Sequence, residues 1–196
     1  MDNLKLDIEQ LKIQINSILN NKPIVLVGMM GVGKSAIGKL LADSLDRCFS
    51  DIDKNIENKL NLKIHEIFDK FGENKFRELE HEEIKKLKIN DNIVLATGGG
   101  AFTFSKNIKL INEKSLSVWI KANKNIIFNR VNKKQINRPM LKNKNLHDHI
   151  NNLLKKRNPL YAKAHIHVES TNETKLIMKN KLLRCINNHL EHGYYE

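Results

Sequence analysis

The segment from Gly28 to Ser35 reads Gly-Met-Met-Gly-Val-Gly-Lys-Ser and fits the pattern G-x-x-x-x-G-K-S. Four apolar residues, 24–27, stand before it and predict a short strand that is buried on both faces. Apolar residues at helical spacing follow and predict a helix that begins at Lys34. A glycine turn could simply join the two elements, but this order of strand, turn and helix predicts a phosphate-binding loop.

Each residue type in this loop has a physical reason. The glycines let successive backbone N–H groups turn inward around a polyphosphate, and the new helix adds the positive end of its dipole. Lys34 can reach the terminal phosphates as a point charge, and the Ser35 hydroxyl can ligate Mg²⁺. The residues expected to hold the phosphates of a nucleotide are Gly31, Val32, Gly33, Lys34, Ser35 and Ala36.

The formal charge of +12 over 196 residues would ordinarily indicate a nucleic-acid partner. The lysines are scattered along the chain without interleaved aromatics, however, which is typical of solvated surfaces. We therefore expect no nucleic-acid partner. Arginine is used where a planar, bidentate fork is needed, and the chain has few arginines. Arg77, Arg138 and Arg157 stand where an anion is expected.

No apolar run is long enough to span a membrane, and the acidic N-terminal residues argue against a signal or transit peptide. Cys48 and Cys185 have no CxxC spacing, so we expect free thiols in a reducing cytoplasm. The length and the hydrophobic content of 40% suit one domain. We expect an appended amphipathic helix over residues 1–21 and a single P-loop domain over residues 22–196.

Residues 1–20 carry an apolar stripe with heptad spacing. Docking of this helix on the domain and self-association are both open, but two heptads are short for a coiled coil. We expect a monomer, with a dimer through residues 1–20 as the alternative.

Strands and helices alternate along the rest of the chain, which predicts an α/β fold with a mostly parallel sheet between helices. The strand over residues 47–50 runs into Asp51 and Asp53, and the strand over 92–96 runs into the glycines of residues 98–100. Alternation along an extended segment predicts that Asp51 and Asp53 lie on the same side. Ligands gather at the carboxyl ends of such strands, so both segments should face the phosphate site. Helix capping by the aspartates and a plain flexible turn at the glycines are the alternatives.

Three helices are expected over residues 54–60, 62–71 and 73–88, and Asn61 is expected to cap the second. In the third, Glu80 lies three residues after Arg77 on the same helical face, where a surface ion pair is the alternative. Residues 132–145 have the composition of a mobile active-site lid. The next helix is expected to run from Leu146 to Asn158.

Taken together, these motifs resemble the shikimate kinase family over about residues 22–190. They are, in order, Gly28–Ser35, Asp51–Asp53, Phe76–Glu80, Gly98–Gly100, Arg138–Leu141 and Arg157–Tyr161. The resemblance implies a three-layer P-loop NTPase fold with a five-stranded parallel sheet of order 2-3-1-4-5. It implies MgATP-dependent phosphorylation of the 3-hydroxyl of shikimate, in the pathway to chorismate and the aromatic amino acids.

On the nucleotide side, the resemblance implies that the loop from Gly31 to Ser35 holds the ATP phosphates. Ser35 would ligate Mg²⁺, with Asp51 assisting through water. Arg138, on the lid, would meet the transferring phosphoryl group together with Lys34. Arg130 is the expected adenine-stacking residue, although it stands one position away from the place that the family pattern predicts.

On the acceptor side, the resemblance implies that Asp53 binds the shikimate hydroxyls and orients the nucleophile or takes its proton. Arg77 and Arg157 would bind the carboxylate, with Glu80 supporting Arg77. The remaining residues implied to bind or line the substrate pocket are Gly99, Gly100, Phe68 and Phe76.

Two other functions fit the residues less well. A kinase for another small acidic polyol, such as gluconate, would share the P-loop but would not need the two arginines with the glycine triplet. A catalytically inert P-loop protein with a regulatory or RNA-binding role would have no chemical need for all of Lys34, Ser35, Asp51, Asp53 and Arg138.

Overall fold

The computed structural model describes residues 2–134 and 146–192. Five strands form one sheet in the order β2-β3-β1-β4-β5, and every neighbouring pair is parallel. The strands are β1 (Ile24–Val27), β2 (Cys48–Asp51), β3 (Ile93–Ala96), β4 (Leu116–Ala122) and β5 (Ile166–Ser170). The strand order implied by the family resemblance is therefore confirmed.

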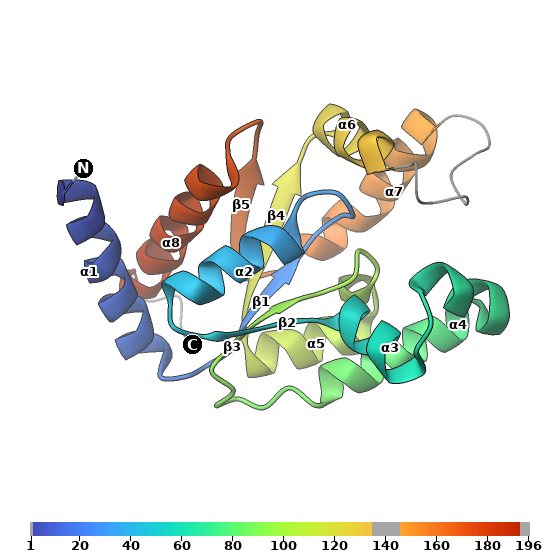
Figure 1. The fold of residues 1–196 in the computed structure, drawn as a ribbon, viewed down its shortest axis with the longest axis horizontal. Coiled ribbons are helices and arrows are strands. Elements are labelled where there is room, and N and C mark those ends of the chain that lie inside the picture. The colour runs from blue at the N-terminus through green and yellow to red at the C-terminus, as the bar shows by residue number, and fades with distance from the viewer. Residues whose placement is uncertain (1, 135–145, 193–196) are drawn as a thin grey trace.

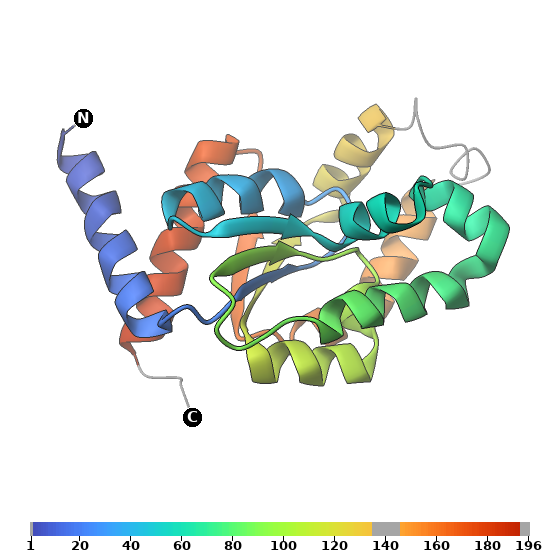
Figure 2. The ribbon, with the colours of Figure 1, turned by 60° about the horizontal axis from the view of Figure 1, so that its bottom comes forward.

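Helices cover both faces of the sheet, as Figures 1 and 2 show. They are α1 (Asp2–Leu19), α2 (Lys34–Ser44), α3 (Ile52–Leu60), α4 (Ile64–Lys85), the 3₁₀ turn η1 (Ala101–Thr103), α5 (Ser105–Lys114), α6 (Lys124–Lys134), α7 (Leu146–Tyr161) and α8 (Lys175–Glu191). On one face, α2 packs on β1, β2 and β3, and α8 packs on β5. On the other face, α5 packs on β4 and α4 packs on α5.

The register brings the carboxyl ends of the strands to one edge of the sheet. Leu26 of β1 pairs with Ala96 of β3, and Asp51 of β2 pairs with that same Ala96. The segments that follow these strands are the P-loop, the Asp51–Asp53 segment and the glycine triplet 98–100. These three segments therefore leave the sheet side by side.

Several predicted boundaries were wrong by a few residues, and two of the errors affect the site. The helix after β2 begins at Ile52, because the Asp51 side chain caps it. Asn61 does not cap the next helix. It ends α3 instead, in a left-handed conformation with φ 50°, and α4 follows after Lys63.

Two other features concern the helices that carry site residues. The break expected at Gly72 is present inside α4, where φ is 78°. The helix α7 runs three residues past its expected end, because Pro159 and Leu160 fit into its last turn.

The N-terminal helix α1 packs on α8, at the opposite end of the molecule from α4 (Figures 1 and 2). Of the predicted stripe, Leu11 and Ile15 are buried, with exposed fractions of 8% and 0%, but Ile18 is exposed at 47%. Leu19, which was not predicted to belong to the stripe, is buried in its place, with an exposed fraction of 3%. Asn16 donates to the Leu45 carbonyl at 2.9 Å and accepts from Arg47 Nε at 3.1 Å. Of the two expectations for this helix, docking on the domain is thus confirmed.

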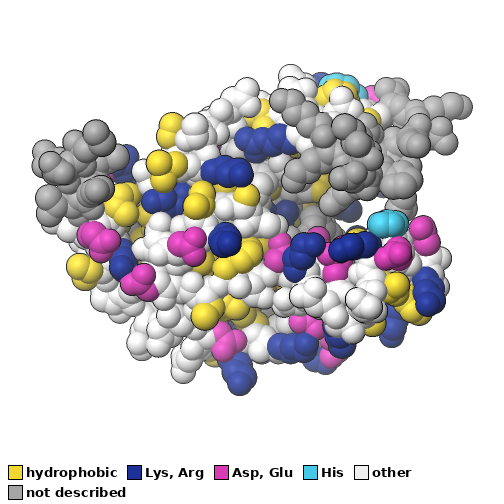
Figure 3. Space-filling view, in the orientation of Figure 1, with side chains coloured by type: hydrophobic (Ala, Val, Ile, Leu, Met, Phe, Trp, Pro, Cys, Tyr) yellow, Lys and Arg dark blue, Asp and Glu magenta, His cyan; other side chains and the backbone are white. Residues whose placement is uncertain are grey.

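Figure 3 shows acidic and basic side chains interspersed over one face of the molecule, and the described residues form no large area of a single sign there. This pattern agrees with lysines on solvated surfaces. Among the helices that the structure describes, none combines the length and the apolar character needed to cross a membrane.

Candidate active site

The P-loop backbone takes conformations that only glycine adopts easily. Gly28, Gly31 and Gly33 have φ values of 133°, 80° and 99°. A Cβ on Gly28 would lie 2.5 Å from the Ile120 carbonyl oxygen, and one on Gly31 would lie 2.9 Å from a Val131 methyl. At Gly28 and Gly31 the loop therefore packs so closely against β4 and α6 that a side chain would not fit. A backbone bent in this way forms a cradle that suits a polyphosphate.

Lys34 begins α2 and is buried, and its Nζ donates to the carbonyls of Gly28 at 2.7 Å and Met29 at 2.9 Å. Burial lowers the pKa of Lys34 to about 8, while the carboxylates of Asp53 and Asp51 act against that shift. Charges from four elements act on this ammonium group: Asp51 of β2, Asp53 of α3, Glu80 of α4 and Arg157 of α7. The lysine is held at the P-loop by the loop's own carbonyls.

Asp51 closes β2 and caps α3, because its Oδ1 accepts from the backbone N–H of Asp53 at 3.0 Å and of Lys54 at 3.4 Å. Asp53 lies in the first turn of that helix. We expected both aspartates on one side of an extended segment, and that geometry is wrong because the helix begins between them. Both carboxylates nevertheless act on Lys34.

The pair of Arg77 and Glu80 on α4 is not a surface ion pair. Glu80 is fully buried and pairs with the Arg77 guanidinium, which also bonds Glu73 Oε1 at 2.8 Å. Burial raises the pKa of Glu80 to about 7, although Arg77 lowers it, and the nearby Asp53 raises it further. Burying such a pair costs desolvation energy, so its presence points to a role for the oriented guanidinium.

The glycine triplet 98–100 gives these side chains the space they occupy. A Cβ on Gly98 would collide with the Glu80 carboxylate and would lie 2.7 Å from Asp53 Oδ1. A Cβ on Gly100 would collide with the Arg77 guanidinium. The triplet is therefore not a plain flexible turn, because two of its members are needed for the carboxylates and the guanidinium to approach the backbone.

Arg157 on α7 joins the glycine triplet to the P-loop. Its NH1 donates to the Gly99 carbonyl at 3.1 Å and lies 3.9 Å from the Met29 sulfur. The same guanidinium lowers the pKa of Lys34 and that of Glu80. Arg157 is thus near both the phosphate loop and the Arg77–Glu80 pair.

Tyr161 is a site residue that sequence reasoning missed. It ends α7, is fully buried and donates its hydroxyl hydrogen bond to the Gly99 carbonyl. It belonged to the motif Arg157–Tyr161, but no role was assigned to it. In the sequence, Tyr161 follows Arg157 by one helical turn. This spacing indicates a shared helical face only if the helix is expected to continue through Pro159.

The expected pocket-lining aromatics lie together on α4. The ring centroids of Phe68 and Phe76 are 4.7 Å apart, and the Arg77 Cζ lies 5.3 Å from the Phe76 ring. Phe76 is buried and Phe68 is half-buried. These rings form an apolar support beside the Arg77 guanidinium.

Arg130 on α6 reaches the P-loop from the other side. Its NH1 donates to the Val32 carbonyl at 3.1 Å and to Ser170 Oγ at 3.2 Å, and its NH2 donates to the Thr171 carbonyl at 2.9 Å. The guanidinium therefore joins the P-loop to the end of β5. Arg138 and most of the predicted lid of residues 132–145 lie outside the described residues.

Ser35 and Ala36 lie exposed in the first turn of α2, next to the buried Lys34. The described residues hold no group of three or more acidic, histidine or cysteine side chains that could bind a metal. A nucleotide-bound Mg²⁺ needs only one or two protein ligands, because phosphates and waters supply the others. The Ser35 hydroxyl and the Asp51 carboxylate are oxygen donors of the required kind.

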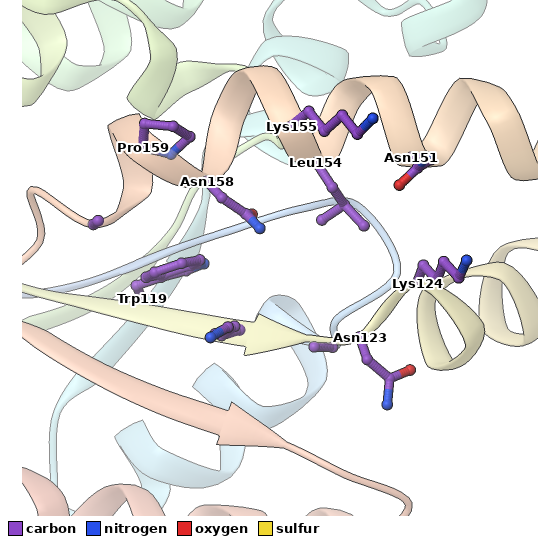
Figure 4. A pocket seen from close by; sticks show the side chains of 11 residues that line it. Trp119, Asn123, Lys124, Asn151, Leu154, Lys155, Asn158 and Pro159 are labelled. Atoms are coloured by element: carbon purple, nitrogen blue, oxygen red, sulfur yellow. The ribbon is translucent and has the colours of Figure 1, made fainter.

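A separate cavity of about 590 Å³ lies between α7, β4 and the start of α6. Figure 4 shows Leu154 and Asn158 of α7 pointing toward Trp119 of β4. None of the site residues predicted from the sequence lines this cavity. Its wall includes Trp119, whose ring centroid lies 5.9 Å from that of Tyr161.

Several known proteins resemble this chain in sequence and in structure. The family model described as shikimate kinase matches residues 30–187. A shikimate kinase of Bartonella henselae is 37% identical over 184 residues, which cover 94% of this chain and 87% of the relative. The solved structure titled shikimate kinase from Acinetobacter baumannii in complex with shikimate superimposes with a TM-score of 0.82. That match has 33% identity and covers 92% of this chain and 99% of the other.

A gluconokinase from Sinorhizobium meliloti has a similar structure, with a TM-score of 0.58. Its sequence identity is 14% over 90% of this chain and 97% of the other, so this match concerns the fold alone.

Proposed function

This chain belongs to the shikimate kinase family, and from that premise we propose that it transfers the terminal phosphoryl group of ATP to the 3-hydroxyl of shikimate. The observation that carries the proposal is the convergence of charged groups around Lys34. The groups of Asp53, Arg157 and Glu80 all act on its ammonium, and they come from three different elements. A phosphate cradle is thereby joined to a site with two guanidinium groups and a carboxylate.

The acceptor fits these groups by its chemistry. A guanidinium binds a carboxylate through two parallel hydrogen bonds, so Arg77 and Arg157 would fix the acid end of shikimate. The Asp53 carboxylate would accept hydrogen bonds from ring hydroxyls, and the backbone at Gly99 and Gly100 would contact the ring. Phe68 and Phe76 would line the apolar side of the pocket.

On the nucleotide side, residues 31–36 would hold the ATP phosphates, with Ser35 as a Mg²⁺ ligand and Asp51 assisting through water. Bound Mg²⁺ would neutralise phosphate charge. Arg130 would contact the nucleotide base, a role supported by its bonds to the Val32 carbonyl and to Thr171.

Catalysis would depend on positioning and on charge, as in other phosphoryl transfers. Asp53 would orient the attacking hydroxyl or accept its proton, and Lys34 would leave the Gly28 and Met29 carbonyls for the phosphates. Arg138, on a lid over residues 132–145, would stabilise the transferring group and help exclude water.

We also propose that the chain acts as a monomer in the cytoplasm, with residues 1–21 as an appended helix and 22–196 as the kinase domain. Packing of α1 on α8 supports the monomer, because the buried Leu11, Ile15 and Leu19 are then not available for a second copy. A dimer through residues 1–20 would appear as a doubled mass in light scattering.

A substrate panel tests the function. Purified protein with MgATP is given shikimate or gluconate, and ADP release is followed by a coupled assay. We expect ADP release that depends on both shikimate and Mg²⁺, with the phosphorylated product identified by mass. Two results would contradict the proposal. One is turnover of gluconate in place of shikimate, and the other is binding of ATP with turnover of neither acid.

A further inference from the structure

Two side chains of α7 donate to the same backbone oxygen. The Tyr161 hydroxyl and the Arg157 NH1 both bond the Gly99 carbonyl, the latter at 3.1 Å. The two residues are four apart on the helix and therefore lie on one of its faces. A carbonyl oxygen has two lone pairs, so these two donors together satisfy it.

The Tyr161 hydroxyl is well suited to act as a fixed donor. The side chain is fully buried, and its ring packs against Trp119 with the centroids 5.9 Å apart. Burial raises the pKa of Tyr161 to about 12, so the phenol keeps its proton at neutral pH. Its hydrogen bond therefore holds the Gly99 carbonyl in one direction.

The backbone at Gly99 is confined on its other side as well. A Cβ on Gly99 would lie 3.0 Å from the Met30 backbone nitrogen and 3.7 Å from Arg157 NH1. The residue thus lies between the P-loop and α7. Any movement of its carbonyl would change the position at which Arg157 NH1 is held.

We propose that Tyr161 is a positioning residue, whose hydroxyl fixes the Gly99 carbonyl and thereby orients the Arg157 guanidinium toward an acceptor carboxylate. This inference rests on the proposed function, because it is measured through shikimate affinity. Tyr161 itself is not proposed to contact the substrate. Its effect passes through Arg157, and the experiment is designed to detect that dependence.

The variant Tyr161→Phe removes the hydroxyl and keeps the ring against Trp119. Calorimetric titration would give the dissociation constants for shikimate and for ATP. We expect shikimate affinity to fall about three- to tenfold, the size of one net hydrogen bond, and ATP affinity to stay within about twofold. In an Arg157→Lys background, Tyr161→Phe should change shikimate affinity by no more than about twofold, because the residues act together.

Ser115→Ala is the matched control for loss of a buried hydroxyl. Ser115 directly precedes the first residue of β4 and is fully buried. Its Oγ donates to the Ile111 carbonyl at 2.6 Å. We expect this variant to leave shikimate affinity unchanged. A wild-type protein that does not turn over shikimate would refute the proposed function itself.

Three results with an active wild-type enzyme would overturn the role of Tyr161. The first is an unchanged shikimate affinity in Tyr161→Phe. The second is an equal loss of affinity for both ligands. The third is the same loss of shikimate affinity in the Arg157→Lys background as in the wild type.

Discussion

The carboxylate of Glu80 is fully buried and pairs with the guanidinium of Arg77 one helical turn earlier on α4. A Cβ on Gly98 would collide with this carboxylate and would lie close to Asp53. Two carboxylates and a guanidinium therefore meet where the backbone has no side chain. The consequences can be measured in the unliganded protein and in the substrate affinities.

The burial of Glu80 predicts a pH-dependent stability. Burial raises the pKa of Glu80 from 4.5 to about 7, so the folded state holds a proton that the unfolded state releases. Its contribution to the free energy of unfolding is complete below pH 4.5 and is lost as the pH rises toward 7, with a slope of at most about 1.4 kcal/mol per pH unit. In urea titrations, Glu80→Gln should lack this loss. Parallel curves for wild type and variant would contradict the assignment.

Gly100→Ala should weaken shikimate binding while leaving the fold intact. The added methyl collides with the flexible end of Arg77, and Gly100 has an ordinary φ of −106°. The guanidinium must therefore move, and we expect about a tenfold loss of shikimate affinity, the size of one charged hydrogen bond. In an Arg77→Ala background the same substitution should add little. Additive losses would mean that the methyl acts elsewhere.

Arg157→Lys should reduce shikimate affinity about 10- to 100-fold, because an ammonium cannot replace the bidentate fork. Arg157 bonds the glycine triplet and only touches the P-loop at Met29, so ATP affinity should change much less. Titration of each ligand separately would measure both effects. An equal loss for the two ligands would contradict the acceptor role of Arg157.

The link between α1 and the domain predicts a loss of stability without a loss of affinity. Asn16 bonds the Leu45 carbonyl and Arg47 Nε, so Asn16→Ala should lower the free energy of unfolding by about 1–3 kcal/mol. The control is Lys12→Ala on the same helix, which breaks the ion pairs with Asp46 and Glu9 at the protein surface and should cost less than about 1 kcal/mol. An equal cost for the two variants would argue against Asn16 as an anchor.

The sequence predicted the architecture well because buried strands and the P-loop have strong local patterns. The strands over residues 24–27, 47–50 and 92–96 were each placed to within one residue, and the residues after β1, β2 and β3 meet as expected. The structure brings Asp53 and Arg157 near Lys34, and Arg77 joins this group through its ion pair with Glu80.

The predictions from the sequence failed in three situations: where a side chain caps a helix, where a helix continues through a proline, and where a contact joins residues far apart in the chain. Asp51 caps α3 and so ends the extended segment that was expected to continue to Asp53. Pro159 did not end α7, and the continued helix brings Tyr161 to the Gly99 carbonyl. The bond between Asn16 and Arg47 joins residues 31 positions apart, and no local pattern indicates such a contact.

The central claim is that the guanidinium groups of Arg77 and Arg157 bind the substrate carboxylate, while Asp53 and Lys34 take part in phosphoryl transfer. The most direct test compares kcat/KM for shikimate and for shikimate methyl ester, measured by ADP release. We expect turnover of shikimate and a kcat/KM at least about 100-fold lower for the ester, because the ester offers the two guanidinium groups no carboxylate to bind. Comparable values for the acid and the ester would contradict it.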